Sequence, residues 1–190
     1  GLLKSTMYGR SVKPPQPPGI WKAVTLPDSN PRTYVADKGD KIYRRSVYTF
    51  WKRGMPPPQM TIMNAPDRES CVARRERTNT PLQALNLLND PVFFECAQVL
   101  AARVLHEASA TTRERLDRAF LLCLARTPSA AERTRLKKYL AAQIGILKNA
   151  PEEAKAMAGK PVAGITLDEQ AAWVGVASVL MNLDEFITKE

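Results

Sequence analysis

Residues 80–190 contain a series of helix-start signals, and these constrain the fold more than any other feature of the chain. Two of them place a capping residue directly before a proline: Thr80 before Pro81, and Asp90 before Pro91. A capping side chain accepts a hydrogen bond from the first helical turn, and proline is tolerated there because its missing N–H would have no partner in the helix. Both positions therefore predict the start of a helix.

Three further starts follow the capping-box pattern, in which Ser or Thr precedes Glu by three residues: Thr111 with Glu114, Ser129 with Glu132, and Thr166 with Glu169. We expect successive helices from 80, over 91–107, 113–125 and 130–149, and from 167 onward, with breaks near Asp90, Ala110 and Pro128. Residues 151–165 are expected to form a short helix and a loop. The apolar faces are expected to include Phe94, Ala97 or Val99, Ala101, Leu105, Trp173, Val176, Ala177, Leu180, Leu183 and Asp184.

Amphipathic helices joined by short loops pack as an antiparallel bundle. The predicted fold is mainly α: an antiparallel helical bundle over residues 80–190, preceded by an extended Pro-rich N-terminal arm and a small β element. We expect one domain, with the arm at 1–40, an Arg/aromatic segment at 41–79 and the bundle at 80–190.

The arm contains residues 11–21, SVKPPQPPGIW, which are typical of turn and polyproline structure. One interpretation of its overlapping PxxP patterns is a docking peptide. We favour a stiff arm laid over the domain, with Trp21 as a buried anchor.

Residues 42–53, IYRRSVYTFWKR, are open to two interpretations. Their aromatic and β-branched content favours a strand, whereas Tyr43, Val47, Phe50 and Trp51 are also spaced as a helical stripe. We expect a strand, with QMTIM at 59–63 as its partner, because a helix cannot run through the three prolines at 56–58.

The positive charge is local. Residues 1–40 hold 6 basic and 3 acidic side chains, residues 41–77 hold 9 and 3, and residues 78–190 hold 13 and 13. This distribution favours a basic patch with an anionic partner, or an internal network of ion pairs, over a uniformly basic tail.

The candidate site combines two arginine clusters with neighbouring aromatic residues: Arg44, Arg45, Tyr48, Trp51, Arg68, Arg74, Arg75, Arg77 and Asn79. A guanidinium offers a planar fork of donors to carboxylate, phosphate or sulfate, and it stacks on aromatic rings. The competing interpretation is structural, with the arginines paired to Asp67, Glu69 and Glu76. We expect bonded, at least half-buried side chains at Arg74 and Arg75, and an external anion site at Arg44 or Arg45.

Other classes of site find little support. Cys71, Cys96 and Cys123 are widely spaced and His106 is the single histidine, a pattern that does not suit a zinc site. Cys96 and Cys123 are expected to be buried thiols. No RNP-like, zinc-finger or helix-turn-helix pattern accompanies the basic residues, which disfavours nucleic acid. We assign no catalytic residue, no metal and no cofactor to this chain, and no apolar run is long enough to span a membrane.

Three collinear segments, RRSVYTFWKR, PDRESCVARRERTNTPLQALNLLNDPVF and AAWVGVASVLMNLDEFITKE, resemble the domain of unknown function 1553, a cytochrome-associated domain abundant in planctomycetes. SVKPPQPPGIW also resembles the lead-in of that family. The resemblance implies a C-terminal part of a larger exported protein, located in the periplasm, the cell envelope or outside the cell. It also implies that haem, when present, belongs to another domain, because this chain has no CxxCH site.

The function we expect is non-catalytic binding or assembly within the larger protein, through the Arg/aromatic surface, with a neighbouring domain, an acidic glycan or another anion. The alternative is part of an enzyme acting on acidic or sulfated polysaccharide, with an active site completed by other domains.

Overall fold

A computed structural model describes the chain except for residues 24, 29–32, 53, 68, 109–110 and 189–190. The chain divides into two compact units. Residues 2–78 form the N-terminal unit, and residues 79–190, with Gly1, form the helical unit.

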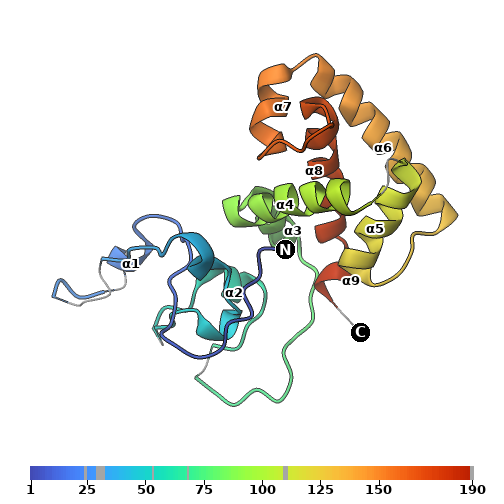
Figure 1. Cartoon of the computed structure of the whole chain (residues 1–190). Helices are drawn as coiled ribbons and strands as arrows, with labels where there is room; N and C mark the ends of the chain where they lie inside the picture. The colour runs from blue at the N-terminus through green and yellow to red at the C-terminus, as the bar shows by residue number, and fades with distance from the viewer. Residues whose placement is uncertain (24, 29–32, 53, 68, 109–110, 189–190) are drawn as a thin grey trace. The chain divides into compact units, whose positions relative to one another are not determined.

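The helical unit confirms the predicted fold class. Its helices are α3 (Pro81–Asn89), α4 (Pro91–Glu107), α5 (Thr112–Leu124), α6 (Ala130–Lys148), α7 (Pro151–Ala158), α8 (Leu167–Met181) and α9 (Asp184–Ile187), shown in Figure 1. The short helix and loop predicted for 151–165 are present as α7 and the segment that follows it.

The predicted caps explain why these helices start where they do. The Thr80 hydroxyl accepts from the backbone N–H of Gln83 at 3.3 Å, and the Gln83 side chain accepts from the Thr80 N–H at 2.9 Å. Asp90 accepts from the N–H of Val92 at 2.8 Å. The capping hydroxyls predicted for α5, α6 and α8 also accept from the first turns of those helices. The breaks near Asp90 and Pro128 are confirmed, whereas Ala110 lies outside the described residues.

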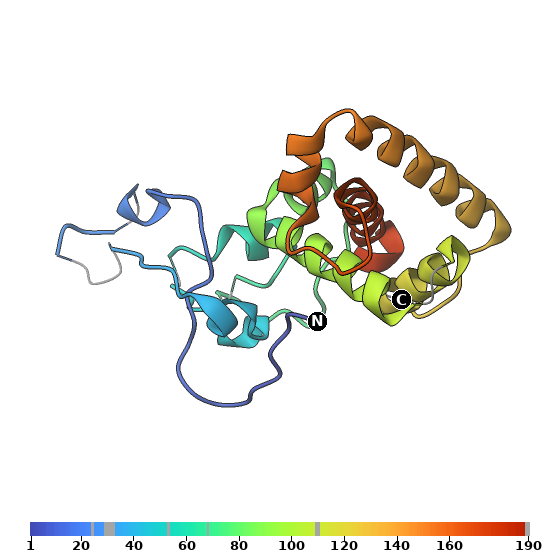
Figure 2. The same ribbon diagram turned by 45° about the horizontal axis from the view of Figure 1, so that its top comes forward.

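Helix α8 is the centre of the helical unit. It packs against α4, α6 and α7, and Figure 2 looks nearly along its axis, with those helices around it. The side chains of Ala171, Trp173, Val174, Val176 and Leu180 are each at most 1% exposed. These residues point in all directions from the helix, and a helix that is apolar on every side is stable only when it is enclosed.

The predicted apolar faces are mostly confirmed. Ala97, Ala101 and Leu105 of α4 are buried, while Phe94 is only partly buried against the core. Leu183 is also partly buried, but Asp184 is exposed because it begins α9 and lies outside the α8 face.

One buried amide joins α8 to the loop that precedes it. Gln170 is fully buried, and its Nε2 donates to the carbonyls of Ala158 and Lys160, both at 2.7 Å. Its Oε1 accepts from the N–H of Val162 at 2.9 Å. The amide thus satisfies the last carbonyl of α7 and two backbone groups of the loop that follows it.

The N-terminal unit is built from short elements: α1 (Ile20–Ala23), the 3₁₀ helices η2 (Gly39–Tyr43) and η3 (Ser46–Tyr48), and α2 (Pro58–Ile62). The prediction of a strand over residues 42–53 is wrong. Arg44 and Thr49 each form only an isolated β-bridge, with Lys4 and Val12 respectively. These residues pair with the arm at separate points, so no continuous ladder forms among the described residues.

The partner strand expected at QMTIM is also wrong, because those residues lie in and directly after α2. Pro58 is the first residue of that helix. A proline is tolerated there because a backbone N–H at this position would have no partner within the helix. Pro56 and Pro57 therefore precede the helix and Pro58 begins it, so none of them interrupts it.

The predicted burial of Trp21 is confirmed, and the rings that it contacts, Tyr34 and Phe50, lie in the N-terminal unit. The Trp21 side chain is 3% exposed, stacked on Tyr34 with ring centroids 5.2 Å apart, and its Nε1 donates to Gln16 Oε1 at 2.6 Å. The Tyr34 hydroxyl donates to the carbonyl of Pro14 at 2.6 Å. The proline-rich stretch is thus bonded within its own unit.

Replacing Gln170 with Leu should lower the free energy of unfolding by roughly 3 kcal/mol or more, because buried backbone groups lose their partners. Chemical denaturation followed by circular dichroism measures this. The control is Gln143→Leu on α6, where the side chain is partly exposed and makes no described hydrogen bond; it should change stability by less than about 0.5 kcal/mol. Equal effects of the two substitutions would contradict the role of Gln170.

Replacing Trp21 with Ala should destabilise the N-terminal unit by roughly 3–5 kcal/mol, the usual cost of removing a large buried aromatic side chain. Urea denaturation of the full chain measures this loss, and limited proteolysis shows whether cleavage within residues 2–78 becomes faster. Val35→Ala, at a side chain that is 68% exposed, is the control. An unchanged urea midpoint for Trp21→Ala would show that the arm does not depend on this anchor.

Candidate anion-binding surface

Arg44 is bound within the N-terminal unit and does not form an external anion site. Its Nη1 donates to the carbonyl of Arg10 at 3.1 Å, and its Nη2 donates to the carbonyls of Thr6 and Tyr8 at 3.0 and 2.5 Å. Its guanidinium carbon also lies 3.8 Å from the ring centroid of Tyr48. Arg44 therefore orders the loop at residues 6–10 and has little capacity left for a ligand.

Arg45 has the opposite environment. Its side chain is exposed, and within the described chain its only acceptor is the Met7 sulfur, 3.8 Å from Nη1. A thioether is a weak, uncharged acceptor, so the positive charge of Arg45 has no counterion there. Of the two arginines proposed for an external site, Arg45 is the one placed to meet a ligand.

The two aromatic candidates are partly covered. The Tyr48 ring lies against Arg44, and its hydroxyl accepts from the backbone N–H of Tyr8 at 2.8 Å. Trp51 is also partly buried. Their rings belong to the packing of the N-terminal unit more than to an open stacking face.

Residues 71–78, called here the basic segment, have no helix or strand, and the side chains of Arg74, Arg75 and Arg77 are all exposed. These three arginines make no hydrogen bond or ion pair within the part of the chain that the structure describes. The expectation that Arg74 and Arg75 are bonded structural residues is therefore wrong.

The acidic residues expected to pair with the basic segment do not do so. Asp67 accepts from the backbone N–H of Glu69 at 2.9 Å, which closes a local turn. Without a helix or sheet to fix their separation, Glu69, Glu76 and the arginines extend separately into solvent. Of the two other candidates, Arg68 lies outside the described residues, and Asn79 belongs to the helical unit, where its Nδ2 donates to Asp184 Oδ1 at 3.1 Å.

The arginines of the helical unit are mostly paired with carboxylates. The ion pairs join Arg103 and Arg118 to Glu107, Arg115 to Glu169, Arg133 to Asp117, and Arg126 to both Glu132 and Glu185. In the described part of the N-terminal unit, the ion pairs instead involve lysines, joining Lys4 to Asp40 and Lys41 to Asp37.

The formal charge follows the same division. Residues 2–78 hold 15 basic and 6 acidic side chains, whereas residues 79–190 hold 13 of each. The whole net charge of +9 thus belongs to the N-terminal unit.

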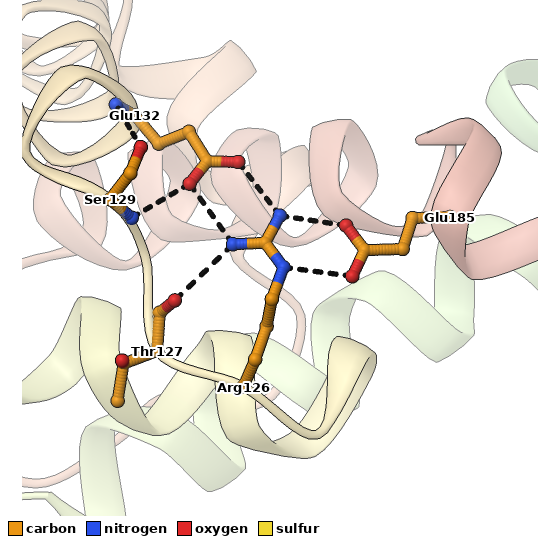
Figure 3. Close-up of polar contacts among 5 residues, drawn as sticks. All are labelled: Arg126, Thr127, Ser129, Glu132 and Glu185. Atoms are coloured by element: carbon orange, nitrogen blue, oxygen red, sulfur yellow. Dashed lines mark hydrogen bonds and ion pairs between the residues drawn. The ribbon is translucent and has the colours of Figure 1, made fainter.

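Arg126 illustrates the paired state (Figure 3). It follows Ala125, which ends α5 in a left-handed conformation, φ 56°. Its Nε and Nη2 donate to the two oxygens of Glu185 at 2.8 and 2.7 Å, and its Nη1 and Nη2 donate to those of Glu132 at 3.0 and 2.8 Å. The bonds from Arg126 to Glu132, followed by the one from the backbone N–H of Ser129, lower the pKa of Glu132 to about 2.

Arg126 thereby joins the start of α6 to α9. A guanidinium that already holds two carboxylates is a structural connection and is not available to an external anion.

The three cysteines and the histidine do not form a common site. Cys71 is exposed, Cys96 is partly buried with its thiol pKa raised mainly by burial, and Cys123 is buried; none of these described thiols forms a disulfide. The prediction of a buried thiol thus holds for Cys123 and in part for Cys96. His106 is exposed late in α4. Among the described residues, no three His, Cys, Asp or Glu side chains gather where they could hold a metal ion.

A groove that the sequence did not predict lies beside the start of α8. It has a volume of about 390 Å³ and an apolar lining that includes Ile144, Leu147 and Pro151, with Lys148 and Asp168 as polar members. A hydrogen bond from Thr166 is the main cause that lowers the pKa of Asp168. The residues that line this groove come from three helices, so no local sequence motif predicts the groove.

No helix in the described chain is long and apolar enough to cross a membrane. The model of the PSD1 family, described as proteins of unknown function (DUF1553), matches residues 1–140. No curated protein and no solved structure matches the chain.

Replacing Arg126 with Gln should make the protein less resistant to acid. A carboxylate with a folded pKa below its ordinary value of 4.5 stabilises the fold above pH 4.5, and this contribution is lost as the pH falls toward the folded pKa of about 2. Without Arg126, that part of the pH dependence between 4.5 and 2 should largely disappear, and the melting temperature at pH 6 should fall.

Thermal unfolding at a series of pH values measures the effect. Arg135→Gln, at an exposed α6 arginine without a described ion pair, should retain the wild-type profile. A wild-type profile in Arg126→Gln would contradict the pairing described for Figure 3.

Proposed function

The chain belongs to the PSD1 family of proteins of unknown function (DUF1553), and from this premise we propose that it is a non-catalytic binding or assembly module. Its basic segment binds an anionic partner, and its helical unit is the folded body that carries the segment. In keeping with the family resemblance, we place this activity within a larger exported protein.

One observation carries the proposal: the arginines of the basic segment are exposed and without partners in the described structure, whereas five arginines of the helical unit are paired with carboxylates. A folded chain that needed these side chains for its own stability would be expected to bond them. Arg74, Arg75 and Arg77 instead keep their donors in solvent.

Their spacing supports the same conclusion. The three arginines fall within four consecutive positions, so their guanidinium groups lie on a short length of chain. Arginine binds sulfate, phosphate and carboxylate through paired N–H donors, and several arginines together bind a polyanion more strongly than a single one does. The excess of positive charge in residues 2–78 would also attract an anionic partner from a distance.

The enzyme alternative has no comparable support. The arginines of the basic segment make no described bond to a carboxylate or to His106, and no described trio of His, Cys, Asp or Glu is placed to hold a metal. We therefore assign the segment a binding role and no reaction.

The test is a triple substitution of Arg74, Arg75 and Arg77 by Gln. Affinity for a heparin oligosaccharide, measured by isothermal titration calorimetry at low salt, should fall about tenfold or more, since three exposed ion contacts of about 0.5 kcal/mol each are removed. A polyglutamate of similar charge is titrated in parallel to separate a sulfate preference from a carboxylate preference. Wild-type affinity should fall as salt rises because exposed charges are screened.

The matched control is a triple substitution of Arg135, Lys137 and Lys138 by Gln. These residues are exposed on α6, and the change removes the same number of charges. The control should lose much less affinity than the basic-segment variant. Equal losses would mean that net charge alone governs binding, and undiminished binding by the basic-segment variant would refute the proposal.

A further inference from the structure

Tyr8 holds a backbone conformation that tyrosine seldom adopts. Its φ is 64°, in the left-handed region, and its side chain is 82% exposed. A bulky residue in this region is strained, because its Cβ crowds the backbone, and such strain persists only where the surroundings impose it. Burial of the ring does not explain the choice of residue, since the ring is in solvent.

Two side chains hold this conformation in place. The backbone N–H of Tyr8 donates to the hydroxyl of Tyr48 at 2.8 Å, and its carbonyl accepts from Arg44 Nη2 at 2.5 Å. Arg44 also binds the carbonyls of Thr6 and Arg10, on either side of Tyr8. The backbone of the loop is therefore fixed before any partner arrives, and little backbone freedom is lost on binding.

The ring belongs to a small exposed surface. Met7 is 53% exposed, Arg45 is exposed, and Val47, which precedes Tyr48 in η3, is 68% exposed. The Met7 sulfur lies 3.8 Å from Arg45 Nη1 and 3.8 Å from the Tyr48 hydroxyl, which joins the loop to η3. We call Met7, Tyr8, Arg45 and Val47 the Tyr8 surface.

We propose that the Tyr8 surface is a docking site for an acidic polypeptide segment that presents a carboxylate beside an apolar side chain. The carboxylate would bind Arg45, whose positive charge has only the Met7 thioether as a described acceptor. The apolar side chain would pack on Tyr8, Met7 and Val47. This proposal is separate from the one for the basic segment and does not depend on it.

The composition of the surface favours a polypeptide over a glycan. Tyr, Met and Arg are enriched at protein interfaces, and tyrosine and arginine are frequent among the residues that dominate binding energy. A sugar ring needs several polar side chains around an aromatic face to bind its hydroxyls. The Tyr8 surface supplies one charged group and three side chains with large apolar parts.

The charge distribution favours an acidic partner over a second copy of the chain. Residues 2–78 hold 15 basic and 6 acidic side chains, so two N-terminal units would repel each other. The helical unit, with equal numbers of the two signs, offers no excess of negative charge. A segment rich in carboxylates is complementary to the N-terminal unit.

The experiment uses the full chain and a short fluorescein-labelled peptide that alternates glutamate with phenylalanine and serine. Fluorescence anisotropy should give a dissociation constant of about 1 mM or lower. Tyr8→Gly should weaken binding about tenfold or more, as expected for the loss of a dominant aromatic contact. Its melting temperature should not fall, because glycine adopts a positive φ without strain. Binding loss without loss of stability separates docking from a structural role.

Four further comparisons define the result. Arg45→Gln should also weaken peptide binding, whereas Leu26→Ala, at a side chain that is 79% exposed in the same unit, should bind as the wild type does. The triple variant of the basic segment should retain Tyr8-dependent binding, shown by an additional loss when Tyr8→Gly is added to it. A peptide with glutamine in place of glutamate should bind more weakly than the acidic peptide.

Wild-type affinity of Tyr8→Gly for the acidic peptide would overturn the proposal, as would failure of the wild-type chain to bind that peptide in the stated range. A Tyr8→Gly variant that loses heparin affinity but keeps peptide affinity would assign the surface to a glycan instead. A wild-type dimer in sedimentation that Tyr8→Gly dissociates would assign it to a second copy.

Discussion

The enclosure of α8 is the constraint on which the helical unit depends. A helix with apolar side chains on every side cannot face water on any of them, so it requires neighbours all round. Helices α4, α6 and α7 supply those neighbours, and each contributes one apolar face while keeping a polar face outside. Burying each large apolar side chain of α8 is worth about 1.5–3 kcal/mol, so this helix contributes strongly to the stability of the unit.

Because α8 is enclosed, backbone groups near it lose access to water and need hydrogen-bond partners within the protein. The loop before it must pass close to the core, and Gln170 satisfies the loop's backbone groups from within the helix. Farther out, Arg126 joins the start of α6 to α9 through two carboxylates. Arginine in this unit is therefore mainly a connector between helices. In the N-terminal unit, Arg44 performs a similar task with backbone carbonyls, while Arg45 and the arginines of the basic segment are not used in this way.

The parts of the fold that could be predicted from the sequence are those determined by neighbouring residues. A cap and its partner are three residues apart, so Thr111, Ser129 and Thr166 could be identified without knowledge of the core. The start of α2 carries only part of this signal: Pro58 occupies the first helical position just as Pro81 and Pro91 do, but the preceding Pro57 has no capping side chain. There the three prolines were wrongly interpreted as excluding the helix that follows them.

The candidate site was less predictable because its geometry depends on distant residues. The carbonyls bound by Arg44 lie 34 to 38 positions earlier in the chain, and no local pattern indicates that they will meet it. Arg74 and Arg75 have acidic neighbours in sequence, but an extended segment does not hold those neighbours at bonding distance. The strained conformation of Tyr8 likewise results from contacts with Tyr48 and Arg44, so the Tyr-Gly pair at 8–9 predicts a turn at most.

The position of α8 in the chain has a consequence for synthesis. Because α8 follows α3 to α7 in the chain, those helices are synthesised before α8, the helix against which they pack. Their apolar faces must remain accessible to solvent or to chaperones until residues 167–181 have been made, since domains generally complete folding only when their whole core is available. The N-terminal unit lacks this dependence: Trp21, Tyr34 and Phe50, which form its aromatic cluster, are all translated before the first residue of α3.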